Sequence, residues 1–227
     1  MGLSLPLIRV ITCWEQTKAQ LVPVGRMGVV RGGIQWLAEQ DEWLHSVVFA
    51  RGITPEELGL RMGGVRGSAV SPITDIEAWN IVHDLATDDD DVVRVGAHGG
   101  WSFAVEYGLG DGAERLVEIS RNGVEAVHLD PSVDHPPAMF SYARDGVYVC
   151  SFGIGEEVWR WGDQPDLLLP ELVAAGVLHS DGEYARPEDE SYQDRDRHTL
   201  ALIETRFGLV LPRDVLESEP LPAFVIA

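Results

Sequence analysis

Short runs of β-branched and aromatic residues follow one another through the middle of the chain, between about residues 92 and 152. Six runs have the length and composition of strands, and they are VVRVGA, WSFAVEYG, RLVEIS, VEAVHLD, AMFSYA and VYVCSF. Most of the joints between them contain glycine, which adopts the positive φ that tight turns require. The pattern therefore predicts an antiparallel meander of about six strands.

The run at residues 101–107 alternates strictly between two kinds of side chain. Trp101, Phe103, Val105 and Tyr107 point to one face of the predicted strand, and small or polar residues point to the other. Because alternate residues of a strand face opposite sides of a sheet, one face of the sheet is aromatic. We expect helices to cover that face.

Helical spacing of apolar residues flanks the predicted sheet on both sides. Helices are predicted over 34–44, after Thr54, after Ser71 or Thr74, over 166–176, over 197–207 and as one turn at 212–216, with a buried strand at SVVFARG (46–52). Thr54, Pro55 and Glu57 form a capped helix start. The helix after Thr74 is predicted to bury Ile76, Trp79 and Val82 or His83. The polar stretch 179–197 is predicted to be a loop.

Together these elements predict an α+β fold, in which the meander is packed on one face by N- and C-terminal helices. Prolines and glycines interrupt residues 1–33, which we interpret as an irregular N-terminal arm before a single domain over 34–227. Met27 is an alternative start for the native protein, and an intact mass would test whether residues 1–26 belong to it.

Acidic residues outnumber basic ones by 37 to 17, which gives a net charge of −20. This charge repels phosphate backbones and anionic lipids, so we expect neither nucleic acid nor a membrane as partner. A basic protein partner is favoured instead. Two cysteines are too few for a disulfide framework, and the N-terminus lacks the pattern of a signal peptide, so we expect a cytoplasmic protein. No motif predicts a cofactor.

Several segments resemble one known family. They are Trp36-Leu37, VVFARGITPEEL (47–58), GGWSFAVE (99–106), Ser120-Arg121 followed by VEAV, Tyr142-Ala143, Asp145-Gly146, GDQPD (162–166) and Ala175-Gly176. The chain resembles, from about residue 34 onward, an actinobacterial family described as the domain of unknown function 6461. The resemblance implies a shared fold and an actinobacterial origin, which the single lysine, Lys18, among 17 basic residues also indicates. It implies no activity and transfers no catalytic residue.

Two groups of residues are candidates for a site. His128 and Asp130 share one strand face, and His135 follows a short turn. These side chains could together bind a metal ion, but the pattern is more typical of a strand that ends in a solvated turn. No metal site is predicted. Trp159 and Trp161 flank Arg160, with Asp163 and Asp166 downstream. Core packing is the favoured interpretation of these tryptophans. If a ring is exposed, they are candidates, together with Trp101, for binding a ligand or partner.

Catalytic motifs are absent. There is no Gly-x-Ser-x-Gly elbow, and Cys150 lies in an alternating strand where a cysteine is usually buried and inert. The glycine-rich loop 108–112 is expected to join two strands, unlike a phosphate-binding loop. If the protein is an enzyme, the candidate catalytic residues are Glu106, His128, Asp130, His135 and Tyr142.

Three functions remain open on the sequence. The first is an acidic protein-interaction module, such as an adaptor or an immunity-type inhibitor of a basic enzyme. The second is an enzyme of unrecognised type, for example in specialised metabolism, with a pocket between the sheet and its helices. The third is a small-molecule-binding protein whose tryptophans line the cavity. The absence of catalytic motifs favours a protein without enzymatic activity.

Overall fold

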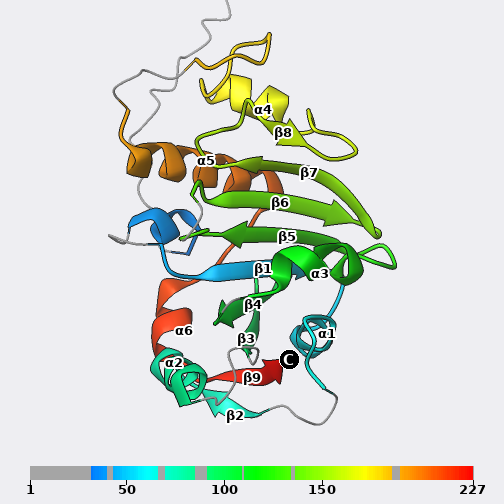
Figure 1. The fold of residues 1–227 in the computed structure, drawn as a ribbon, viewed down its shortest axis with the longest axis vertical. Coiled ribbons are helices and arrows are strands. Elements are labelled where there is room, and N and C mark those ends of the chain that lie inside the picture. Colours follow the sequence, from blue (N-terminus) through cyan, green and yellow to red (C-terminus); the bar gives the residue numbers. More distant parts are fainter. Residues whose placement is uncertain are drawn as a thin grey trace, which may run out of the picture.

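The computed structural model describes residues 32–39, 43–65, 70–84, 91–108, 110–133, 136–185 and 190–226. These residues form an α+β fold built on one large antiparallel sheet (Figure 1). Within the described ranges the sheet has nine strands, which are β1 (Ser46–Arg51), β2 (Val70–Ile73), β3 (Asp91–His98), β4 (Trp101–Tyr107), β5 (Glu125–Asp130), β6 (Met139–Arg144), β7 (Val147–Gly153), β8 (Arg160–Trp161) and β9 (Leu221–Ile226).

Helices lie on both faces of this sheet. The helical segments of the described ranges are the 3-10 helix η1 (Gln35–Glu39) and the α-helices α1 (Pro55–Arg61), α2 (Asp75–Asp84), α3 (Gly112–Ile119), α4 (Leu169–Ala174), α5 (Tyr192–Phe207) and α6 (Arg213–Ser218). η1, α2, α4, α5 and α6 pack against one face, and α1 and α3 pack against the other. The prediction that helices cover a single face is therefore wrong.

Strand order departs from a simple meander. The strands lie in the order β2-β9-β3-β4-β1-β5-β6-β7-β8, and neighbouring strands are antiparallel. β1 precedes the predicted meander in sequence but lies in its middle, between β4 and β5. The C-terminal strand β9, which pairs with β2 and β3, is not among the predicted elements.

The predicted strand RLVEIS is the helix α3. Leu116 and Ile119 are buried against the sheet, whereas Glu118 is exposed, which is the spacing of a helix. A segment this short fits the helical and the strand period almost equally well. The glycine-rich loop before it therefore leads into a helix and does not join two strands.

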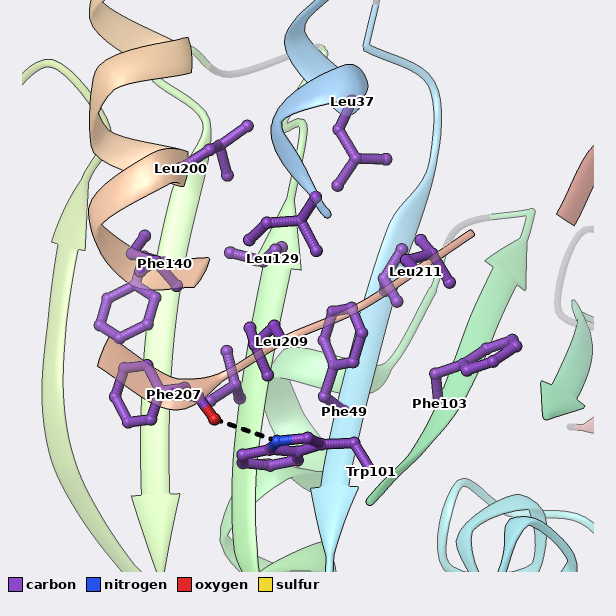
Figure 2. Packing of buried hydrophobic residues seen from close by; sticks show 14 of the residues in the cluster. Leu37, Phe49, Trp101, Phe103, Leu129, Phe140, Leu200, Phe207, Leu209 and Leu211 are labelled. Carbon is purple, nitrogen blue, oxygen red and sulfur yellow. Dashed lines mark hydrogen bonds between the residues drawn. The ribbon is translucent and has the colours of Figure 1, made fainter. Parts of the chain in front are cut away.

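The aromatic face predicted for residues 101–107 is confirmed. Trp101, Phe103, Val105 and Tyr107 lie in the larger hydrophobic core, covered by helices (Figure 2). The Trp101 indole Nε1 donates to the Phe207 carbonyl over 3.1 Å, which ties β4 to the C-terminal end of α5. The opposite face of β4 is also buried, so this strand contributes to two cores.

The prediction from local sequence is confirmed for the start of α1 and, in part, for the buried face of α2. Thr54 caps α1 by accepting the Glu57 amide over 3.2 Å, as predicted. In α2, Trp79 and Val82 pack against the core, but Ile76 is 64% exposed. Ile76 lies in the first turn of α2 and is exposed to solvent, so it does not belong to the buried face predicted for this helix.

The last predicted elements differ mainly in their bounds. α5 begins at Tyr192, five residues before the predicted start, because Ser191 caps it by accepting the Asp194 amide over 3.1 Å. Asp91 is buried at the start of β3 and accepts the Gly110 amide. Residues 1–31 and 85–90, which include most of the N-terminal arm, lie outside the described residues.

Candidate functional site

A pocket of about 900 Å³ opens at the end of the sheet where β5 and β7 end and β6 begins. Its volume is in the range of small-molecule sites. Segments far apart in the sequence form its walls, and the lining residues are Trp43, Pro131, Val133, Pro136, Pro137, Ala138, Ile154, Gly155, Glu156, Tyr184, Tyr192, Arg195 and Asp196. Ten of these thirteen residues are apolar or aromatic, and three are charged.

Aromatic side chains that line the pocket are held in place by polar contacts. The Tyr184 hydroxyl donates to the Gly155 carbonyl over 3.2 Å. Trp43 Nε1 donates to the His45 carbonyl over 2.8 Å. The Arg195 guanidinium lies 5.3 Å from the centre of the Tyr192 ring, close enough for a cation–π contact. These contacts fix aromatic surface around a concave opening.

A second candidate surface lies at the edge strand β8, where two of the predicted binding residues project into solvent. Trp159 is 72% exposed and Trp161 is 48% exposed. Two large aromatic side chains exposed so close together form an apolar patch of the kind found at binding surfaces. Asp163 and Asp166 are also exposed beside them.

The backbone that carries these tryptophans is firmly attached to the sheet. Trp161 pairs with Ser151 of β7, and Arg160 donates to Asp166 over 2.7 Å. The chain then turns at Gly162, whose φ of 120° favours glycine and where a Cβ would lie 2.4 Å from the Val149 carbonyl oxygen. The tryptophans are therefore displayed from a rigid edge.

Two predicted catalytic residues, Glu106 and His128, meet in a buried polar cluster with Ser46. The Ser46 hydroxyl donates to Glu106 Oε2 over 2.5 Å and lies 2.9 Å from His128 Nε2. His128 Nε2 is 3.3 Å from the same carboxylate oxygen. The other oxygen, Glu106 Oε1, accepts the Gly112 amide at the start of α3 over 2.8 Å.

This cluster has a structural explanation. Burial raises the pKa of Glu106, but hydrogen bonds from His128, Ser46 and Gly112 outweigh burial and hold that pKa below its usual value. The ionised carboxylate therefore occupies the N-terminus of α3, the place where a ligand anion would otherwise bind. Glu106 and His128 are both buried and do not line the pocket.

The remaining predicted residues are not brought together. Asp130 accepts the Ser132 amide at the end of β5, and Tyr142 lies on the opposite sheet face, where its hydroxyl donates to Glu125 over 3.2 Å. Burial and the Glu125 carboxylate raise the pKa of Tyr142. Trp101 is buried in the core and presents no ring to a partner. His135 lies outside the described residues.

Other site chemistry is limited. Burial raises the pKa of the Cys150 thiol to about 11, so the thiolate is scarce at neutral pH. Across the described ranges, no three or more His, Cys, Asp or Glu side chains are grouped so that they could hold a metal ion. Across the same residues, no helix combines the length and the apolar character needed to cross a membrane.

Sequence analysis missed the residues of the pocket. Trp43 was assigned to a helix face, and Tyr184, Tyr192 and Arg195 fell in a stretch predicted to be a polar loop. Two tyrosines within so polar a stretch were the available signal, since aromatic side chains there are rarely explained by solvation alone. Their convergence with the prolines of 131–137 depends on the tertiary structure.

Comparison with known proteins adds the family but no activity. Neither the curated proteins nor the solved structures contain a match to the chain. Residues 34–221 match a family of unknown function, DUF6461. This match covers most of the chain and nearly all of the described sheet and helices. The chain belongs to the family of unknown function DUF6461.

Proposed function

We propose that this protein is an interaction module that binds a basic protein partner through the surface around Trp159 and Trp161. The observation that carries the proposal is the exposure of these two rings, 72% and 48%, on a rigid strand edge. Tryptophan is among the residues that contribute most to protein interfaces, and truncating such an anchor typically costs about 2 kcal/mol or more of binding free energy.

The charge around the two tryptophans supports a basic partner. Asp163 and Asp166 follow them in sequence and are exposed, and Asp166 is the residue that pairs with Arg160. The loop with Asp181 and Glu183, both exposed, approaches Arg160 at Gly182. The net charge of −20 extends this field over the molecule and would accelerate encounter with a cationic protein.

Preorganisation supports the same surface. Arg160 donates to the carbonyls of Glu157 and Val158 over 3.2 and 3.4 Å, as well as to Asp166. Because these contacts hold the backbone on both sides of Trp159, a partner would not have to order it on binding. We infer that most of the binding free energy comes from burying the rings, with the acidic residues contributing mainly to association rate and salt dependence.

The test is affinity capture from the native host with the tagged protein, at low and at high salt, followed by a binding measurement with the purified partner. We expect one stoichiometric basic protein whose affinity falls as salt rises. A double variant, Trp159→Ala with Trp161→Ala, should weaken binding at least about 30-fold, the equivalent of roughly 2 kcal/mol. Ile76→Ala, which truncates another exposed hydrophobic side chain on α2, serves as control and should leave affinity unchanged.

Two results would contradict the proposal. One is a captured partner that binds the double variant as tightly as the unchanged protein. The other is recovery of no basic partner at either salt concentration, with the protein verified as folded.

A further inference from the structure

We propose that the pocket at the end of the sheet binds a small hydrophobic organic cation, that is, an apolar body carrying an ammonium or guanidinium group. This site is independent of the interaction surface around Trp159 and Trp161. Its apolar lining, its balance of charge and the fixed geometry of its walls favour such a ligand.

Exposed apolar side chains gather at this pocket. Among the described residues, nine large hydrophobic side chains are exposed, and three of them, Val133, Tyr184 and Tyr192, line it. Exposed apolar surface costs roughly 25 cal/mol per Å² relative to burial. Deeper in the pocket, Trp43 and Ile154 extend the same surface into the core. A ligand with an apolar body would remove this surface from water.

Charge in the lining favours a cation. Glu156 and Asp196 contribute two carboxylates, and Arg195 is the single basic residue among the lining side chains. The Arg195 guanidinium already lies over Tyr192, and its Nε is 4.0 Å from Glu190 Oε2. A ligand anion would therefore compete with an existing carboxylate for Arg195 and face the field of a protein with net charge −20.

Aromatic rings give a cation a further advantage over a neutral ligand of the same shape. A cation near the face of Trp or Tyr is attracted by the negative face of the ring, more strongly as water is excluded. Trp43 and Tyr184 supply such rings, and Glu156 supplies an exposed carboxylate at the mouth. An ammonium group between these rings and this carboxylate would make a cation–π contact and an ion pair at the same time.

The walls are fixed before any ligand arrives. Tyr184 is anchored on Gly155 and Trp43 on the His45 carbonyl. The turn after β7 is tied to the segment before β6 by the Ile154 amide, which donates to the Ala138 carbonyl over 2.6 Å. Little conformational entropy is lost on binding to a pocket with such walls.

Isothermal titration calorimetry with a matched probe set tests the inference on the full chain. The probes are 4-phenylbutyltrimethylammonium, the neutral 4-phenylbutanol, the anionic 4-phenylbutanoate and N-acetylarginine amide. We expect the ammonium probe to bind at least about fivefold more tightly than the alcohol, which corresponds to roughly 1 kcal/mol of cation–π and charge interaction. The anion and the arginine derivative, which lack either the positive charge or the apolar body, should bind more weakly still.

Variants then place the probe in the pocket. Tyr192→Ala, at a side chain that is 83% exposed, should weaken the ammonium probe at least about threefold without unfolding the protein. Glu156→Gln should reduce the preference for the ammonium over the alcohol. Glu118→Gln, which alters an exposed carboxylate on α3 that does not line the pocket, is the control and should change neither quantity.

Absence of binding of the ammonium probe up to about 5 mM, a concentration equivalent to only about 3 kcal/mol of binding free energy, would overturn the inference. Equal affinity of the alcohol and the ammonium probe would overturn it as well. So would an affinity of the arginine derivative equal to that of the ammonium probe. Because none of these variants alters Trp159 or Trp161, failure here leaves the proposed partner surface untouched. Loss of partner binding in the tryptophan double variant would likewise leave this pocket intact.

Discussion

Replacement of Glu106 by alanine tests whether its buried cluster holds the fold together. The carboxylate accepts hydrogen bonds from Ser46 at 2.5 Å and from the Gly112 amide at 2.8 Å, and lies 3.3 Å from His128 Nε2. Removing it leaves the buried Gly112 amide, the buried His128 ring and the half-buried Ser46 hydroxyl without their shared acceptor. Leaving a buried polar group unpaired typically costs about 1–3 kcal/mol, so we expect a total loss of about 3–5 kcal/mol.

The expected loss is large enough for standard assays. For a protein of this size, about 3–5 kcal/mol corresponds to a fall in Tm of roughly 6–20 °C. Urea unfolding followed by circular dichroism would measure the same loss as a free energy. Glu217→Ala is the control, because Glu217 makes an exposed contact with Arg213 at 2.6 Å within one helix and should cost no more than about 0.5 kcal/mol.

The dependence on pH gives this prediction a second, independent measurement. The pKa of Glu106 lies below its usual value in the folded protein, so the ionised carboxylate contributes stability above about pH 4.3, the ordinary glutamate pKa. That contribution is lost as pH falls through the lowered pKa. The stability difference between the unchanged protein and Glu106→Gln should therefore be largest near neutral pH and shrink below about pH 4.

The reasoning would be refuted by a Glu106→Ala variant within about 1 kcal/mol of the unchanged protein, since a buried hydrogen-bonded carboxylate cannot be removed so cheaply. A pH-independent difference for Glu106→Gln would contradict the ionised state of the carboxylate.

Three further predictions concern other parts of the fold. Arg94→Leu should destabilise the protein by about 3 kcal/mol or more in urea unfolding, because the buried guanidinium donates to three backbone carbonyls and lies 3.4 Å from Asp75; a loss below about 1 kcal/mol would contradict this. Gly162→Ala should disturb the edge at β8, because φ is 120° and the new Cβ would lie 2.4 Å from the Val149 carbonyl oxygen; a changed tryptophan fluorescence spectrum would report it, and an unchanged spectrum with unchanged stability would count against it. Cys150, buried and with its pKa raised to about 11, should react with iodoacetamide at pH 8 only in denaturant, as mass spectrometry would show; rapid labelling of the native protein at this residue would be incompatible with the structure.

Local sequence patterns were sufficient for most of the sheet. β1 and five of the six predicted strands, β3 to β7, form strands, because β-branched and aromatic runs between turn glycines specify a strand locally. The alternation in β4 also identified the face that carries Trp101 and Tyr107. The cap at Thr54 marked the start of α1, since capping depends on only a few adjacent residues.

The structure of two segments could not be predicted from local sequence, because it depends on the residues that pack around them. RLVEIS is short enough to fit two periods, and it becomes α3 because Leu116 and Ile119 can then pack on the sheet while the Gly112 amide meets Glu106. The alternation in WRW puts Trp159 and Trp161 on the same side of an extended segment, but it does not indicate whether that side faces the core or solvent. That difference depends on β8 being the edge strand of the sheet.

Long-range pairing and the pocket were decided only by the tertiary structure. Nothing in the sequence of β1 indicates that it lies between β4 and β5, because antiparallel pairing depends on which strands the whole chain brings together. The pocket likewise joins Trp43, the connection before β6, Tyr184 and the start of α5. The sequence by itself determined most of the strands and helices and the acidic character of the chain, since periodicity and charge are local properties. Which elements lie beside one another, and therefore the pocket and the exposure of Trp159 and Trp161, follow from contacts between residues that lie far apart along the chain.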